Sequence, residues 1–166
     1  SVAGACSTTA SVRVAPSVNN PGVWAGRSDV NWSNASNWCD VTVPTATVNV
    51  TIPTTGPSFN PTLNTTSSIN SINVQSGRIL TISGAGDLQI AGAVTNTGSI
   101  VADAGKVTFN GTTAQAIPSN VFAGNLIKDL TINNAAGVTL NGALRLTGVL
   151  TATNGIFNAN GNLTLA

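Results

Sequence analysis

The chain has 166 residues, of which 42% are hydrophobic and 7% are charged, and its formal net charge is +1. It contains no His, Met or Tyr, and its five acidic residues are all Asp, so most of the side chains that act as catalytic acids, bases and metal ligands are missing. With no basic cluster, few aromatic rings and no apolar run of about 18 residues, we expect neither a nucleic-acid partner nor membrane insertion.

Residues 1–22 are the first predicted region, an N-terminal strand and linker. A short strand is predicted over Ser11–Pro16, and the sequence Asn19–Gly22 is typical of a turn. Cys6 and Cys39 are the two cysteines, and their spacing fits no zinc or redox motif. We predict a disulfide between them, which would stabilise the fold by about 3 to 4 kcal/mol and indicate an oxidising compartment. Two buried thiols are the alternative.

Three tryptophans, Trp24, Trp32 and Trp38, precede the first clearly alternating strand. A stack of short strands must cover its apolar end, and one Trp side chain can bury about 150 Å2 or more. We therefore predict a Trp-rich cap at this point of the chain.

The polar residues around these rings allow two other interpretations, both of them binding sites. In the first, one or two of the rings stack on a surface glycan while Asn31, Asn34 and Asn37 bond its hydroxyl groups. In the second, Asp29, Asn31, Asn34 and Asp40 ligate calcium, which takes oxygen ligands. Their spacing differs from the Asp-x-Asn-x-Asn-Gly pattern, and Asn and Asp in turns usually bond their own backbone.

Residues 23–68 are predicted to contain the cap and the first coil. Val48, Val50 and Ile52 alternate with polar residues in ATVNVTI, which is typical of a short, half-buried strand. Prolines fix the turns around this strand, at Pro44, Pro53, Pro57 and Pro61.

From Ile69 onward, apolar-polar-apolar triplets recur between glycines. Such short alternation predicts short strands with one buried side, and the glycines suit tight corners. The predicted strands are Ile72–Val74, Leu80–Ile82, Leu88–Ile90, Val107–Phe109, Leu130–Ile132, Val138–Leu140, Leu144–Leu146 and Leu163–Leu165.

These triplets also form a longer repeat over residues 69–166. Ile72 aligns with Leu130 and Ile82 with Leu140, and small gaps at glycines extend the match to the end. A period of about 56 to 58 residues fits about three coils of about 20 residues each. We predict an all-β fold, a right-handed parallel β-helix (solenoid). An antiparallel β-sandwich, which the Asn-Gly pairs would suit, is the alternative.

We find no catalytic constellation in the sequence. Glycoside hydrolysis needs two carboxyl groups at a set separation, and no Ser or Cys has a His to activate it. Asp87 and Asp103 are the acids of the first repeat, and the second repeat has Ala159 in place of Asp103. We expect both carboxylates to lie on a solvated face, and we expect no cofactor and no enzymatic activity.

Three stretches carry a family resemblance: WAGRSDVNWSNASNWCD, VPTATVNVTIP, and the long run from NLIKDLTINN to NGNLTLA. They resemble the repetitive regions of large secreted and cell-surface proteins of Bacteroidota, including adhesins and gliding-motility proteins exported by the type IX secretion system. Residues 1–15 also resemble the last strand of immunoglobulin-like repeats that precede such regions. The resemblance implies an extracellular or cell-surface location.

We therefore expect a structural or adhesive β-solenoid segment that acts as a stalk or spacer. Leu163–Leu165 is followed by no residues that would close the final coil, so we expect neighbouring domains or subunits to stack there. Stacking of identical subunits head to tail would make a filament.

Overall fold

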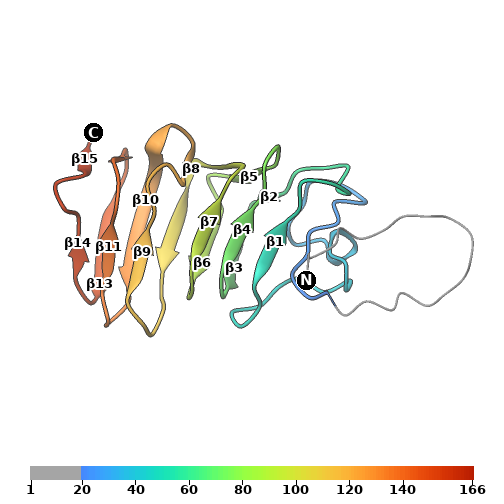
Figure 1. The fold of residues 1–166 in the computed structure, drawn as a ribbon, viewed down its shortest axis with the longest axis horizontal. Coiled ribbons are helices and arrows are strands. Elements are labelled where there is room, and N and C mark those ends of the chain that lie inside the picture. The colour runs from blue at the N-terminus through green and yellow to red at the C-terminus, as the bar shows by residue number, and fades with distance from the viewer. Residues whose placement is uncertain (1–19) are drawn as a thin grey trace, which may run out of the picture.

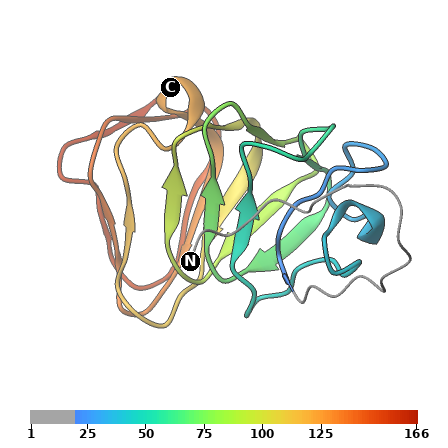
Figure 2. The same ribbon diagram turned by 45° about the vertical axis from the view of Figure 1, so that its right-hand side comes forward.

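The computed structural model describes residues 20–166, whose strands stack in parallel as a β-solenoid of about six turns (Figure 1, Figure 2). All pairings between its named strands are parallel, which confirms the solenoid and shows that the antiparallel sandwich is wrong. The predicted strand Ser11–Pro16 and the resemblance of residues 1–15 to immunoglobulin-like repeats lie outside the described residues.

Each turn passes through three strand positions in the same order. The first position is a row of strands that lie side by side along the long axis in Figure 1. It consists of two three-stranded sheets, the first made of β1 (Val50–Ile52), β4 (Ile72–Val74) and β7 (Val94–Asn96) and the second of β9 (Gln115–Ile117), β11 (Val138–Leu140) and β14 (Phe157–Asn158). Within the described residues, no strand pairing joins β7 to β9. We call this row the first ladder.

The second and third ladders meet in two long strands. The second contains β2 (Thr62–Leu63), β5 (Ile79–Ile82), β12 (Leu144–Leu146) and β15 (Leu163–Leu165), and the third contains β3 (Thr66–Ile69), β6 (Asp87–Ile90) and β13 (Leu150–Asn154). Both β8 (Ser99–Phe109) and β10 (Leu126–Asn133) run through the two positions, because each pairs with strands of both ladders. The helical segments are η1 (Ala35–Asn37) and η2 (Ala123–Asn125). These two segments are the only helical ones among residues 20–166, and neither is long and apolar enough to cross a membrane.

A single apolar core runs along the inside of the turns. Successive side chains of a strand point to opposite sides, so every second residue faces inward. Leu88 of β6 pairs with Val107 of β8, which pairs with Leu130 of β10, and all three are fully buried. The tryptophans of the cap belong to the same core, which extends through Leu146. All eight predicted triplets lie within strands of the structure, and the strand predicted to contain Val48, Val50 and Ile52 is observed as β1, which begins at Val50.

The long repeat predicted from sequence does not match the turns. Ile72 lies in the first ladder, whereas Leu130, its predicted equivalent, lies in the third. The step between paired positions also varies from turn to turn, since it is shorter from Leu88 to Val107 than from Ala102 to Ile127. Strands of all three ladders share one apolar-polar-apolar pattern, so an alignment can place one ladder on another without disturbing the pattern. The structural repeat is therefore the single turn.

Corners after the third ladder are held by buried polar groups. The Asn134 amide nitrogen donates to the Thr113 carbonyl at 2.7 Å and to Gln115 Oε1 at 2.8 Å. Gln115 in turn donates to the carbonyls of Ile90 at 2.9 Å and Gly92 at 2.8 Å. These bonds join consecutive turns at the corner that leads from the third ladder to the first, where the chain bends.

The alternation in β11 predicts a large difference between two neighbouring substitutions. Leu140 points into the core with 1% of its surface exposed, whereas Thr139 is half-buried on the outer side. Leu140→Asp should lower the free energy of unfolding by about 4 kcal/mol or more, because it buries an unpaired charge. Thr139→Asp should cost about 1 kcal/mol or less. Denaturant unfolding of both variants checks this, and equal losses would contradict the assigned inner and outer sides.

Candidate functional site

The three cap tryptophans form one buried aromatic cluster. Trp38 meets Trp24 and Trp32 edge to face, with ring centroids 5.1 and 4.8 Å apart. Trp24 donates its indole N–H to the Phe59 carbonyl at 2.8 Å, and Trp32 donates its indole N–H to Ser67 Oγ at 2.9 Å. All three side chains have 0% exposure. The cap prediction is confirmed, since these rings cover the apolar end of the first turn.

The cap also continues the strand ladders. Trp24 N–H donates to the Thr51 carbonyl at 2.9 Å, and Thr51 N–H donates to the Gly22 carbonyl at 2.9 Å. In the second ladder, Trp32 N–H donates to the Thr62 carbonyl at 3.1 Å, and Thr62 N–H donates to the Val30 carbonyl. Two of the three strand positions of the first turn, β1 and β2, are thus paired with the cap.

On its far side, the cap satisfies its own backbone groups. Ala25 N–H donates to the Asn37 carbonyl at 2.6 Å, and the Asn31 carbonyl accepts from the Asn37 side-chain amide at 3.0 Å. The Trp32 carbonyl accepts from the Trp38 indole at 2.8 Å. Such internal satisfaction removes the free edge that would pair with another strand.

Asp29 and Asn37 organise the turn between the tryptophans. Asn37 is fully buried, and its Oδ1 accepts from Ser28 N–H at 2.9 Å and Asp29 N–H at 3.2 Å. Asp29 accepts from the side chains of Asn34 at 2.9 Å and Asn37 at 2.7 Å, and from Asn31 N–H at 2.8 Å. The Asn34 amide, followed by the other two donors, lowers the pKa of Asp29 below its usual value. Its charged form therefore favours the folded state above the usual pKa, and this contribution is lost as the pH falls through the lowered value.

The geometry does not support stacking of a sugar on the tryptophan rings, and glycan binding stays an untested prediction. Rings that are 0% exposed offer no face on which a sugar could stack. The amide oxygens of Asn31 and Asn34 accept from the backbone N–H groups of Ser33 and Ser36, as in ordinary turns. The sequence places the aromatic rings and the amides close together, but it does not show that the rings face the core.

The structure assembles only part of the predicted calcium site. Asp29, Asn31 and Asn34 lie together, but the Asp29 carboxylate receives N–H donors, as described above. Asp40 bonds its neighbour Thr42, whose backbone nitrogen lies 3.4 Å from Asp40 Oδ1. Within residues 20–166, no group of three or more His, Cys, Asp or Glu side chains is placed to hold a metal. Calcium binding stays an untested prediction.

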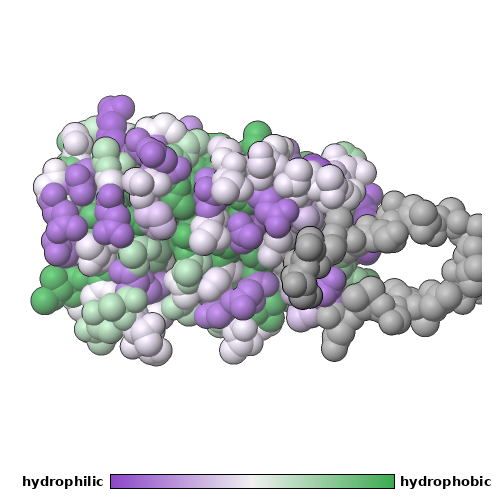
Figure 3. Space-filling model, in the orientation of Figure 1, coloured by the Kyte–Doolittle hydropathy of each residue, from purple (hydrophilic) through white to green (hydrophobic). Residues whose placement is uncertain are grey.

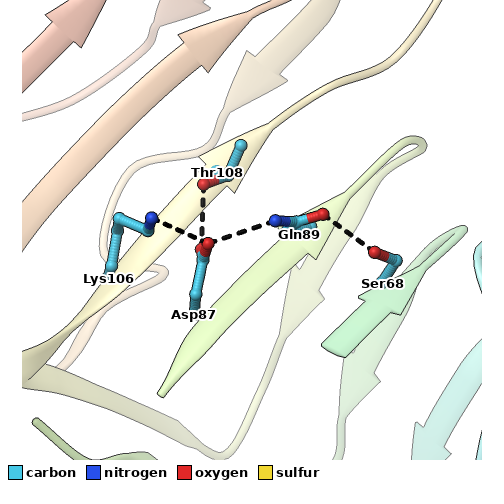
Figure 4. Close-up of polar contacts among 5 residues, drawn as sticks. All are labelled: Ser68, Asp87, Gln89, Lys106 and Thr108. Atoms are coloured by element: carbon cyan, nitrogen blue, oxygen red, sulfur yellow. Dashed lines mark hydrogen bonds and ion pairs between the residues drawn. The ribbon is translucent and has the colours of Figure 1, made fainter. Parts of the chain in front are cut away.

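A polar cluster on the outer side of the third ladder was missed by the sequence analysis (Figure 4). At its centre, Asp87 accepts from Lys106 Nζ at 2.9 Å, from Thr108 Oγ1 at 2.9 Å and from Gln89 Nε2 at 3.1 Å. Ser68 extends the cluster by donating to Gln89 Oε1 at 2.8 Å. We call these five residues the Asp87 cluster.

The Asp87 cluster corrects the expectation that Asp87 is solvated. Its exposed fraction is 6%, because Lys106 and Thr108 of the next turn lie against it, whereas Asp103 is exposed as expected. Ser68, Gln89 and Thr108 occupy paired positions in three successive turns, so the bonds run along the solenoid axis. The carboxylate accepts from three donors, and two of them, Lys106 and Thr108, come from the next turn, which suits a structural group better than a reactive one.

Comparison with known proteins places part of the chain in a family. A family described as a domain of unknown function (DUF8693) matches residues 23–105, which is half of the chain. The matched segment begins at the cap and ends within β8, so the family's unit includes the tryptophan cluster and the first turns. No curated protein and no solved structure matches the chain.

The predicted Cys6–Cys39 disulfide cannot be placed, because Cys6 lies outside the described residues. Cys39 is buried against Val23 and Ala25 at the cap. Alkylation of the denatured, non-reduced protein should modify neither cysteine, and prior reduction should make both reactive. Mass spectrometry that finds both cysteines alkylated before reduction would refute the disulfide.

Removal of the Asp87 carboxylate should destabilise the solenoid. Asp87→Ala leaves the donors of Lys106, Thr108 and Gln89 without their acceptor, so we expect a loss of about 1 to 3 kcal/mol in unfolding free energy. Asp103→Ala is the matched control on an exposed carboxylate of the next turn, and it should change stability by less than about 0.5 kcal/mol. Chemical denaturation that gives both variants the same stability would contradict a structural role for the cluster.

Proposed function

We propose that this chain, which belongs to the family described as a domain of unknown function (DUF8693), is a rigid structural segment. The proposal is argued from the geometry of the solenoid. In our proposal it acts as a spacer or stalk in an extracellular surface protein and holds other modules away from the cell. The observation that carries this proposal is the single core, which joins the cap to the turns without interruption as far as Leu146.

Three features of the described residues support a rigid rod. Strands of neighbouring turns are joined by hydrogen bonds in the nine-stranded sheet and in two three-stranded sheets, so separating two turns breaks several bonds at once. Buried polar groups are used for the same purpose, since Gln115, Asn134 and Asp87 all bond to residues of another turn. The Trp24 ring is bonded to the first turn through the Phe59 carbonyl, so the cap belongs to the same body.

The extracellular location rests on sequence arguments. The predicted Cys6–Cys39 disulfide would suit an oxidising compartment. The resemblance to repetitive surface proteins of Bacteroidota favours the same location and suggests export by the type IX system. We propose no enzymatic activity, because the buried carboxylate of Asp87 is held by three donors, two of which come from the next turn.

Single-molecule energy transfer tests the rigid-spacer proposal. Dyes attached at Val41 in the cap and at Leu165 in β15, both exposed, should give one narrow distance distribution that does not change with salt concentration. A flexible linker would give a broad distribution instead. The Leu140→Asp variant supplies the control, because disruption of the core should broaden the distribution. A broad distribution in the unaltered chain would rule out a rigid spacer.

A separate labelling experiment tests the location. A membrane-impermeant reagent that reacts with lysine should label Lys128, whose side chain is exposed, on intact cells of the source organism. Labelling that occurs only after cell lysis would contradict a surface location and would leave the rigid-rod proposal standing.

A further inference from the structure

The first ladder is interrupted between its two three-stranded sheets, in the middle of the solenoid. β7 pairs only with β4, and β9 pairs only with β11, so no strand pairing joins β7 to β9 within residues 20–166. The same two turns stay paired on their other sides, because β8 and β10 pair with each other. We call the place where β7 and β9 face each other the first-ladder break.

Backbone groups of both strands point toward this break. The Ala93 carbonyl and the Thr97 N–H bond to the preceding turn. Alternate residues of a strand direct their N–H and C=O groups to opposite neighbours, so those of Val94 and Asn96 point toward the following turn. By the same alternation, Ala116 of β9 faces the break from the other side, since its two neighbours in the strand bond to β11. Both edges thus carry donors and acceptors that have no ladder partner.

Two side chains bridge the break, one near each end. Gln115 donates from Nε2 to the Gly92 carbonyl at 2.8 Å, and Asn96 donates from Nδ2 to the Val121 carbonyl at 2.7 Å. Val121 is buried and lies in residues 118–125, which connect β9 to β10. Because side chains make these bonds, the strands stand farther apart here than strands joined by direct backbone bonds.

Asn96 brings an unpaired acceptor to the break. It occupies an inward position, since it pairs with Val74, which pairs with Ile52, and both of these residues are fully buried. Its Oδ1 is buried and has no hydrogen-bond partner among the described residues. The other buried side-chain atom of this kind is Oδ1 of Asn110, at the corner that leads into β9. Buried acceptors in native proteins are nearly always satisfied, by protein groups or by ordered water.

We propose that the first-ladder break binds ordered water molecules, one of which donates a hydrogen bond to Asn96 Oδ1. Water both donates and accepts, so it satisfies the N–H and the C=O groups of the two facing edges together. A metal cation would satisfy the oxygens alone. An additional strand would have to pass the bridging side chains of Gln115 and Asn96. Bound water therefore takes the place of strand pairing between these two turns.

Water reaches the break from the outer side of the first ladder. Thr95 and Ala116 are the outward residues in the middle of β7 and β9, and both are exposed. Figure 3, in the orientation of Figure 1, shows hydrophilic and hydrophobic side chains mixed along the solenoid. The proposal is independent of the spacer function, because it concerns only how two neighbouring turns are joined.

Cross-relaxation between water and amide protons tests the proposal in the unaltered chain. We expect cross-peaks to long-lived water at the amides of Val94, Asn96 and Ala116. The amide of Thr131 is the matched control and should show none, because its strand is paired on both sides. Absence of the cross-peaks at all three amides would overturn the proposal.

Removal of the unpaired acceptor provides a second test. Asn96→Val restores the apolar inward row, so magnetic relaxation dispersion of the water signal should detect at least one long-lived water molecule fewer. Asn73→Val, on the outer side of the neighbouring strand, is the matched control and should leave the number unchanged. An unchanged number in a folded Asn96→Val protein would contradict the proposal. If this variant does not fold, the cross-peaks of the unaltered chain decide the question.

Replacement of sodium by potassium in the buffer separates water from a bound cation. Water in the break predicts no change in the amide chemical shifts of Val94, Asn96 and Ala116. Shift changes confined to these amides would assign a cation to the break and overturn the proposal.

Discussion

Hydrogen bonding between successive turns is the constraint on which the rest of this structure depends. A strand in a parallel ladder finds its partners one turn earlier and one turn later in the chain, as the pairs Leu88–Val107 and Ala102–Ile127 show. No turn is therefore stable alone, and inward side chains such as Leu130 are buried only when both neighbouring turns are present. The same constraint gives the solenoid two edges, each of which exposes backbone groups and apolar side chains unless something covers it.

The cap solves this problem at one edge by three means at once. Its backbone pairs with Thr51 and Thr62, its three indole rings cover the apolar cross-section, and its outward carbonyls are satisfied within the cap. Asn37 is central because its buried amide bonds both Asp29 and the Asn31 carbonyl. Along the sides, polar bonds also join the turns. The Asp87 cluster does so on the outer side of the third ladder, and the Gln115–Asn134 pair does so at a corner. Stiffness along the axis follows from these repeated contacts between turns.

Local patterns in the sequence identified the strands but not their positions around the coil. Triplets such as Val138–Leu140 alternate clearly and all lie in strands, whereas Thr66–Ile69 and Gln115–Ile117 went unnoticed because Ser67 and Gln115 are polar residues at buried positions. Ile72 and Leu130 were equated because strands of different ladders look alike in sequence. The tryptophans indicated a cap, but their burial, which leaves no ring face for a sugar to stack on, depends on Thr51, Phe59 and Ser67. Asp87 is buried by residues of the following turn, a relation that depends on the length of one turn.

The pairing of strands between turns is the central claim, and nuclear Overhauser contacts between backbone protons test it most directly. Contacts between Leu88 and Val107, and between Val107 and Leu130, should appear with the pattern of parallel strands. In an antiparallel arrangement, strands adjacent in sequence would pair instead, and β11 and β12 would show contacts across the Asn141–Gly142 turn. The structure predicts the parallel contacts between turns and none of the antiparallel contacts across the Asn141–Gly142 turn. Observation of contacts between Leu140 and Leu144 as paired residues, with none between Leu88 and Val107, would contradict it.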